Sequence, residues 1–201
     1  MPSMEEKKII KRNKILDAAS ALFMDKSFAT TAIDDVVKMA GVAKGTFYLY
    51  FKDKYDLLDQ IVERKTAEVL RQAIGRLRET PGSESMSLRE KVIFTAEYAE
   101  DYLASHRELA ALLSRNLANC FRRFVSGADE ELSQVVSVFM QEFVAAGFTE
   151  SRARMIIYLI TETIGSVYCD AVLGTGPFTP EEIKAELNAA VARITEAKDN
   201  D

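Results

Sequence analysis

The sequence predicts an all-α protein with a small N-terminal head and a larger helical body. Apolar residues recur at helical spacing along most of the 201 residues. Only four prolines and nine glycines interrupt the chain, and no segment alternates apolar and polar residues for long enough to indicate a strand. We therefore expect about nine helices, the first three in a head at residues 1–56 and the others in a body at residues 57–201.

Charge is distributed unevenly between these two parts. The net charge of −5 argues at first against a nucleic-acid partner. Residues 1–56, however, hold ten Lys/Arg and eight Asp/Glu, a net charge of +2, while the remainder carries −7. The less acidic part is therefore the head, where a nucleic-acid partner would be expected to bind.

No targeting segment is visible. The first ten residues contain no apolar signal core, and the longest strongly apolar run, residues 155–160, is too short to span a bilayer. We expect a cytoplasmic protein with no membrane partner.

The first helix is expected at residues 7–26, where an apolar stripe includes Ile15, Leu16 and Leu22. Basic residues cluster at its start: Lys7, Lys8, Lys11, Arg12 and Lys14. Such a cluster is typical of a solvated helix face, but beside a DNA-binding motif it also suits contact with the phosphate backbone. Both interpretations stay open.

Two short helices separated by Gly41 follow in residues 31–54. The first, residues 32–40, has Thr31 as its expected N-cap. Glycine reaches positive φ without steric cost, so Gly41 is expected to form the turn. The second, residues 43–50, surrounds an inward Phe47 with lysine, threonine and tyrosine. This arrangement indicates a helix-turn-helix.

Residues 9–60 resemble the DNA-binding region of the tetracycline-repressor (TetR) family of transcriptional regulators. The joint spacing carries the resemblance, through Thr31, Val36, Ala40, Gly41, Val42, Lys44, Gly45, Thr46, Tyr48, Tyr50, Phe51, Lys54, Leu57 and Leu58. One departure is Ala43, where the family often has a serine that caps the helix.

The resemblance implies specific DNA contacts. It places Lys44, Gly45 and Thr46 at the major groove. Tyr48, with Tyr50 after it, is expected to contact phosphate or a thymine methyl, although head packing is the alternative for both. The remaining two residues, Thr31 and Lys54, are expected to hold phosphates at helix N-termini.

The body begins after a long helix expected at residues 53–79. Capping boxes predict helix starts after Ser87, Ser105 and Thr179. Between the last two, residues 117–147 are expected to form one helix, or two broken near Gly127, that ends at Gly147. Thr149 is expected to cap the next helix, which ends before Gly174.

Aromatic residues are more numerous in the body than a minimal helical core needs. Resemblance to a ligand-responsive family implies an effector pocket, and pockets lined by aromatics with a few polar groups are typical of small-molecule sites. The expected lining is Phe94, Tyr98, Tyr102, Phe121, Phe139, Phe143, Tyr158 and Glu162, with Phe124, Tyr168 and Arg115 nearby. The effector is expected to be apolar or aromatic.

The last two helices are expected to form the homodimer interface, since the family pairs these helices with their symmetry mates as a four-helix bundle. The apolar stripes assigned to it include Ile156, Ile160, Ile164, Val167, Leu187 and Val191. Packing of these stripes inside the monomer is the alternative.

Nothing in the sequence indicates catalysis. The one histidine, His106, is expected at the surface, and Cys120 and Cys169 match no metal-ligand spacing. Both cysteines are expected to be buried hydrophobes, with a redox sensor as the alternative. We expect no enzyme activity, no metal and no cofactor.

These observations predict a ligand-responsive DNA-binding transcriptional regulator. It is expected to be a repressor that binds a palindromic operator as a dimer and is released by a small-molecule effector. The alternative is an all-helical interaction or small-molecule carrier module without specific DNA binding.

Overall fold

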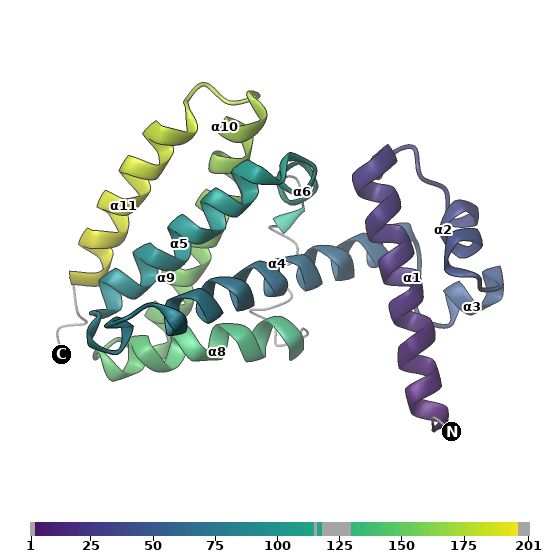
Figure 1. Ribbon diagram of the computed structural model, residues 1–201, viewed down its shortest axis with the longest axis horizontal. Helices are drawn as coiled ribbons and strands as arrows, with labels where there is room; N and C mark the ends of the chain where they lie inside the picture. The colour runs from purple at the N-terminus through teal and green to yellow at the C-terminus, as the bar shows by residue number, and fades with distance from the viewer. Residues whose placement is uncertain (1–2, 115, 118–129, 197–201) are drawn as a thin grey trace. The chain divides into compact units, whose positions relative to one another are not determined.

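The computed structural model describes residues 3–114, 116–117 and 130–196, excepting the side chains of 130 and 131. These residues form helices and turns without a strand (Figure 1). The helices are α1 Met4–Lys26, α2 Ile33–Ala40, α3 Lys44–Tyr48, α4 Lys54–Glu79, α5 Leu88–Ser105, α6 Arg107–Leu113, α8 Glu130–Ala145, α9 Glu150–Glu162, α10 Cys169–Leu173 and α11 Pro180–Glu196.

A π-helical segment, Thr163–Tyr168, joins α9 to α10 in one uninterrupted run. Counted that way, the described residues form nine helices, together with a short 3-10 turn at Ser83–Ser85. The predicted all-α fold, with three helices in an N-terminal head, is confirmed.

The chain divides into a head unit, Met1–Val62, and a body unit, Glu63–Asp201. Helix α4 crosses this boundary, which lies six residues beyond the one expected from the sequence. The reason is that the first turns of α4 bury Leu57, Leu58 and Ile61. These residues belong to the apolar core of the head, so the head needs the start of α4 to be complete.

The head is built on the apolar face of α1, which packs against α2. Helix α1 begins at Met4, earlier than expected, because Ser3 and Glu6 form a capping box that satisfies two backbone N–H groups. The rings of Phe47 and Phe51 lie 5.5 Å apart, and both are fully buried.

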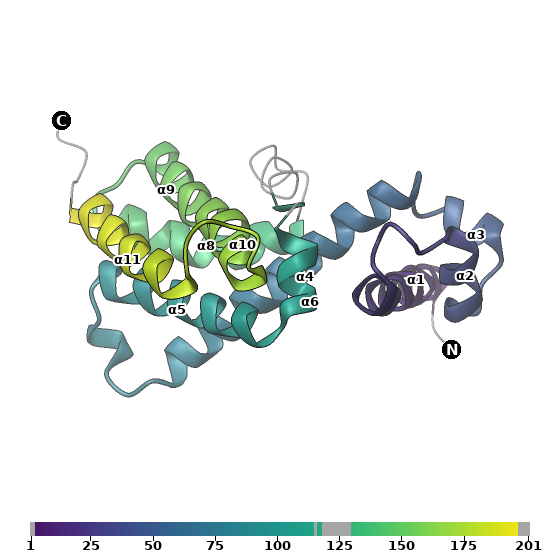
Figure 2. The same cartoon turned by 90° about the horizontal axis from the view of Figure 1, so that it is seen from above.

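Helix α11 packs against α5 in the body unit, while α6 contacts α10 and α8 contacts α9 (Figure 2). Two of the predicted capping boxes are confirmed: Ser87 caps α5 with Glu90, and Thr179 caps α11 with Glu182. Thr149 caps α9 as predicted, by accepting a hydrogen bond from the Arg152 N–H.

The third predicted capping box, at Ser105, is wrong. Ser105 is the last residue of α5, and its hydroxyl donates to the Asp101 carbonyl. His106 precedes α6 instead and makes no side-chain cap. The reason is that a serine at a helix end bonds equally well to the carbonyl of the preceding turn.

The run Glu150–Leu173 is long and apolar enough, by length and composition alone, to cross a membrane. The sequence suggested only residues 155–160, and the π-helical segment extends that run to 24 residues. Core helices of soluble proteins pass the same test. This run contacts α5, α6, α8 and α11 through its own segments, so it is a central packing element of the body.

Candidate nucleic-acid interface and ligand cavity

The turn between α2 and α3 depends on Gly41, which has φ +66° and ends α2 in the left-handed region. The next residue, Val42, donates to the Val37 carbonyl at 3.0 Å. A residue with a Cβ would be strained at this φ. Glycine therefore fixes the angle at which the chain enters α3, as the helix-turn-helix interpretation requires.

The N-cap of α2 is Ala32, so the prediction of Thr31 was wrong. The Ala32 N–H donates instead to the Asp35 carboxylate at 3.1 Å. Thr31 is buried, and its hydroxyl donates to the Ser27 carbonyl at 2.8 Å. This geometry favours a packing role for Thr31 over the expected phosphate contact.

Helix α3 presents one face to the head core and one to solvent. Phe47 is its buried residue, whereas Lys44, Gly45 and Tyr48 are exposed, Tyr48 at 53 %. A Cβ built on Gly45 would meet no atom within 4 Å. Glycine is therefore not required there by packing, and the backbone is open to a partner.

Two further residues expected on this surface, Thr46 and Tyr50, are half-buried. Ala43 is the N-cap of α3 and makes no side-chain hydrogen bond. The family often has a serine at this position, and a serine would cap the helix. The missing side-chain bond at Ala43 agrees with that expected difference.

Lys44 forms an ion pair with Asp34 of α2, at 2.7 Å between Nζ and Oδ1. Both side chains are largely exposed. The hydrogen bond that the Lys44 ammonium donates to Asp34 raises the pKa of Lys44 above its usual value. The Lys44 ammonium is therefore held over the start of α3 by a neighbouring carboxylate.

Lys54 lies at the start of α4 and binds the chain that connects α1 to α2. Its Nζ donates to the carbonyl oxygens of Phe28, at 2.7 Å, and Thr31, at 2.8 Å. The same atom lies 4.2 Å from the centroid of the Phe28 ring, within cation–π range. The Lys54 ammonium, which was expected to hold a phosphate, thus makes its hydrogen bonds to carbonyl groups within the head.

The basic residues at the start of α1 are all exposed. Arg12 donates to the Gln60 side chain at 2.6 Å, and Lys8 pairs with Glu5 at 3.2 Å. Among the described residues, the side chains of Lys7, Lys11 and Lys14 have no hydrogen bond or ion pair, while the Lys7 backbone N–H donates to the Ser3 carbonyl at 3.0 Å.

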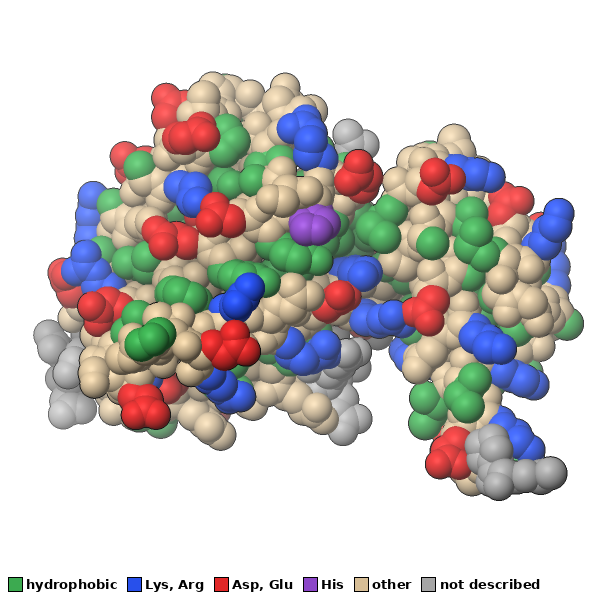
Figure 3. All heavy atoms as spheres, viewed as in Figure 1, with side chains coloured by type: hydrophobic (Ala, Val, Ile, Leu, Met, Phe, Trp, Pro, Cys, Tyr) green, Lys and Arg blue, Asp and Glu red, His purple; other side chains and the backbone are tan. Residues whose placement is uncertain are grey.

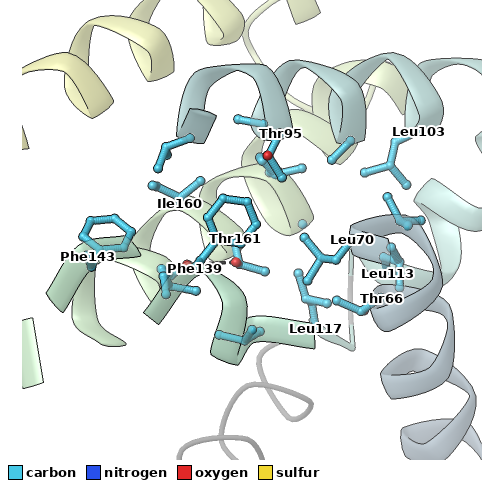
Figure 4. A pocket seen from close by; sticks show the side chains of 18 residues that line it. Thr66, Leu70, Thr95, Leu103, Leu113, Leu117, Phe139, Phe143, Ile160 and Thr161 are labelled. Carbon is cyan, nitrogen blue, oxygen red and sulfur yellow. Dashed lines mark hydrogen bonds between the residues drawn. The ribbon is translucent and has the colours of Figure 1, made fainter. Parts of the chain in front are cut away.

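A cavity lies in the body unit among α4, α5, α6, α8, α9 and the π-helical segment (Figure 4). Its accessible volume is about 90 Å³, and about 780 Å³ with the space around its opening included. The lining is Thr66, Val69, Leu70, Val92, Thr95, Ala96, Ala99, Leu103, Leu113, Leu117, Val136, Phe139, Phe143, Ile157, Ile160, Thr161, Ile164 and Gly165.

Of the predicted pocket residues that the structure describes, only Phe139 and Phe143 line this cavity. Tyr98 instead donates to Gln72 at 3.1 Å, and Phe94 lies with it at a separate shallow depression. The ring of Tyr102 stacks on His106 at 4.0 Å. Those assignments to the cavity were wrong because α5 turns its tyrosines away and its small residues inward.

Tyr158 and Glu162 also lie outside the cavity lining. Tyr158 is exposed on α9, whose Ile157 and Ile160 line the cavity instead. Phe121, Phe124 and Arg115 lie outside the described residues.

No pattern in the sequence singles out Thr66, Thr95 and Thr161 as the polar residues of the lining. Threonine within an apolar helical stripe is compatible with core packing, surface exposure or a cavity. The position of the helices around it decides among these, and that position depends on residues distant in sequence.

The apolar stripes assigned to the dimer are mostly used inside the body. Ile156, Ile164, Leu187 and Val191 are buried in the monomer, and Ile160 lines the cavity. Val167, at 44 % exposure, is the member of the set that reaches solvent. A second copy cannot contact side chains that the chain itself covers, so the assignment of the buried residues is corrected.

A different face of α9 and its continuation is exposed and apolar. It consists of Met155, Tyr158, Leu159 and Val167. These residues recur at helical spacing, so they form one stripe on the outside of the run Glu150–Leu173. We call this stripe the outer α9 face.

Cys169 and His106 are the cysteine and the histidine among the residues that the structure describes. Cys169 is fully buried, and burial raises the pKa of its thiol to about 12, so the thiolate is disfavoured. Cys120 lies outside the described residues. The single histidine lies at the surface (Figure 3), with its Nδ1 2.7 Å from the Tyr102 carbonyl. The described residues contain no group of three potential metal ligands.

Comparison with known proteins identifies the head. Residues 15–61 match the family model described as bacterial regulatory proteins, tetR family. The HTH-type transcriptional regulator YvdT of Bacillus subtilis, itself uncharacterised, is 45 % identical over 67 residues, which cover 33 % of this chain and 34 % of YvdT. Matches to the first curated relatives span between about a third and a half of their length.

Solved structures extend the similarity of fold to the body. A TetR transcriptional regulator from Rhodococcus sp. RHA1 has a TM-score of 0.61 at 21 % identity, covering 92 % of this chain and 94 % of that one. FadR from Bacillus subtilis, solved with stearoyl-CoA, has a TM-score of 0.51 at 19 % identity, covering 89 % and 96 %. The head therefore matches the tetR family of bacterial regulatory proteins, and the chain as a whole shares the fold of these solved structures.

Proposed function

We propose that the protein is a transcriptional regulator that binds duplex DNA through the exposed face of α3. The observation that carries this proposal is the placement of α3. The Gly41 turn and buried Phe47 fix the helix, while Lys44, Gly45 and Tyr48 stay exposed. Helix-turn-helix proteins insert such a second helix into the major groove. The family match covers this whole surface and supports the assignment.

Within that interface we assign each exposed residue a role. Gly45 lets the backbone approach the DNA because no side chain intervenes, and Lys44 and Tyr48 contact phosphate or base edges beside it. Half-buried Thr46 and Tyr50 contribute from the edge of the surface. The basic start of α1 adds contacts with the phosphate backbone.

We infer that the working form is a homodimer on a palindromic operator. The five residues of α3 offer few base contacts, so one head provides little specificity, whereas two heads reading two half-sites provide more. The outer α9 face offers an apolar surface on which a second copy can pack. The buried residues Ile156, Ile164, Leu187 and Val191 hold these helices in place inside the monomer.

The protein is proposed to act as a repressor that a small apolar or aromatic effector releases. Helix α4 lines the cavity with Thr66, Val69 and Leu70, and the same helix begins in the head at Lys54. A ligand that favours one position of α4 therefore acts on both units through one helix. The effector changes DNA affinity only by its differential affinity for the two states, and DNA weakens effector binding by the same factor.

The test is selection of DNA from a randomised duplex library with the full chain, followed by affinity measurement on the enriched sequence. The proposal predicts enrichment of an inverted repeat. A carrier module without specific DNA binding predicts no enrichment, together with ligand binding that added DNA leaves unchanged.

A further inference from the structure

Resting on the proposed binding of duplex DNA by α3, we propose that Leu49 selects a thymine in each half-site by contacting its C5-methyl group. Leu49 follows α3 directly and is 78 % exposed. Among the described residues, only Met4, at the start of α1, is an equally exposed large apolar side chain. Three observations carry the assignment: the backbone conformation of Leu49, its position beside Gly45, and the chemistry of its side chain.

The helical turn of α3 continues through Leu49. Its backbone lies in the right-handed helical region, at φ −75° and ψ −22°, and its N–H donates to the Thr46 carbonyl at 3.3 Å. The N–H groups of Tyr50 and Phe51 both donate to the Phe47 carbonyl at 3.0 Å. Phe47 and Phe51 are buried, so they hold this turn against the core of the head. The backbone of Leu49 is therefore fixed although its side chain is in solvent.

Leu49 borders the open backbone at Gly45. The two residues are four apart, so they lie on one face of the helix, and a helical side chain leans toward the preceding turn. A Cβ built on Gly45 would meet no atom within 4 Å, so the Leu49 side chain does not cover that backbone. A base edge that approaches Gly45 therefore comes alongside Leu49.

The chemistry of the side chain decides which base edge fits beside it. Leucine neither donates nor accepts a hydrogen bond. In the major groove every base presents hydrogen-bonding groups, and thymine alone adds a methyl group, at C5. An amino or carbonyl group placed against leucine would lose its water without a new partner, whereas a methyl group gains by leaving water. Leu49 thus favours thymine over the other bases at the position that it contacts.

Tyr48 is the neighbouring side chain that competes for the same role. It is 53 % exposed on α3, and its ring lies 5.2 Å from the ring of Phe47 in an edge-to-face arrangement. The Tyr48 ring therefore rests against the core of the head, and its hydroxyl is suited to a phosphate oxygen. Leu49 has no polar group for the phosphate backbone, so the two side chains differ in the DNA groups that they fit.

The experiment compares thymine with deoxyuridine, which lacks only the C5-methyl group. The duplexes carry the inverted repeat selected by the full chain, with each thymine replaced in turn and symmetrically in both half-sites. Affinity is measured by fluorescence anisotropy at one fixed salt concentration. The proteins are the wild type, Leu49→Ala, Leu49→Met, which keeps an apolar side chain of similar reach, and Tyr48→Ala as the matched control.

At one thymine in each half-site, we expect deoxyuridine to weaken wild-type binding about fourfold for each methyl group lost, hence about fifteenfold for the two. Leu49→Ala should bind the two duplexes nearly equally at that position. Leu49→Met should keep most of the difference, and Tyr48→Ala should keep all of it at a lower overall affinity. Discrimination that is absent at every thymine, that survives in Leu49→Ala, or that Tyr48→Ala removes as well would overturn the proposal.

Melting followed by circular dichroism checks the free protein. Leu49→Ala should melt at the wild-type temperature because its side chain is in solvent. A clear decrease would place Leu49 in the core of the head and contradict the proposal.

The selection step separates this proposal from the regulator function on which it rests. If no sequence is enriched from the library, the regulator function fails and the role of Leu49 fails with it. If an inverted repeat is enriched and bound specifically, yet every thymine in it can be replaced without loss, only the role of Leu49 fails.

Discussion

The Nζ of Lys44 lies 2.7 Å from the Oδ1 of Asp34, so the exposed cation of α3 is paired with a carboxylate of α2. DNA has to compete with Asp34 for this ammonium. Replacing Asp34 with asparagine should therefore raise affinity for all duplexes several-fold, because it removes the competitor and one repulsive charge. Fluorescence anisotropy on the selected operator and on a scrambled duplex measures this.

Lys44→Met should act in the opposite direction. It should lower affinity and reduce the slope of log K against log salt by about 1, as expected for one lost phosphate contact. Asp25→Asn, on α1, removes the same charge as Asp34→Asn and serves as its control. If Asp25→Asn raised affinity as much as Asp34→Asn, a general charge effect would replace the specific competition.

Lys54 should act mainly on the stability of the head. Lys54→Met retains the aliphatic stem but removes the ammonium from the Phe28 and Thr31 carbonyls. We expect a loss of about 1–3 kcal/mol in the free energy of unfolding of the head, since hydrogen bonds to charged groups are the stronger ones. Thermal melting followed by circular dichroism measures it, with exposed Lys52→Met as the control.

The salt dependence of DNA binding separates this role from the phosphate contact that the family resemblance implied. A positioning role leaves the salt slope of Lys54→Met unchanged. A slope reduced by about 1, with unaltered melting, would instead assign Lys54 to the DNA.

The outer α9 face should carry the dimer. Replacing exposed Leu159 and Val167 with glutamate should give a folded monomer, because the charges would be buried at the apolar contact. Phe178→Glu alters another exposed apolar residue and should leave the dimer intact. Analytical ultracentrifugation gives the mass and circular dichroism the helix content.

Ile164→Glu provides a contrasting case. Its side chain is buried inside the monomer and lines the cavity, so the substitution should unfold the body. A folded Ile164→Glu monomer, with Leu159→Glu and Val167→Glu still dimeric, would restore the interface first expected from the sequence.

Glu100 should make the body less stable as the pH rises from 5 to 8. The side chain is 0 % exposed, and burial raises the pKa of its carboxyl to about 7, although Lys184 at 3.8 Å opposes that shift. Glu97 and Asp101 add to the shift, and Asp101 holds Lys184 at 2.6 Å. The Glu100 oxygens have no hydrogen-bond partner among the described residues.

The sign follows from proton uptake. Between the usual pKa of about 4.5 and the raised value, the folded state binds more protons than the unfolded state, so stability decreases with pH. The full effect at pH 8 is about 3 kcal/mol. Glu100→Gln should melt higher than the wild type at pH 8 and show a flatter pH dependence. Parallel melting curves across this pH range would contradict the assignment.

The head could be predicted from sequence because its determinants are local. Gly41 specifies its own turn, and the spacing of the apolar residues around it defines the two helices. The capping boxes at Ser87 and Thr179 were likewise found because both partners lie three residues apart. Thr31 misled because a capping residue and a buried hydroxyl look alike in sequence.

The cavity and the exposed apolar face could not be predicted in the same way. Helix α9 has apolar residues on more than one side, and only its packing decides that Ile160 faces the cavity while Leu159 faces solvent. The tyrosines of α5 suggested a polar pocket wall, yet Tyr98 donates a hydrogen bond to Gln72 and the Tyr102 ring stacks on His106. These outcomes depend on contacts between helices far apart in sequence.

The most direct test of the account is the affinity of the full chain for three duplexes at one fixed salt concentration: the selected inverted repeat, one half-site of it, and a scrambled sequence. The account predicts that the inverted repeat binds at least about 10³-fold more tightly than the scrambled duplex. The half-site should bind much more weakly than the intact repeat. Equal affinity for all three would contradict sequence-specific binding by two α3 helices.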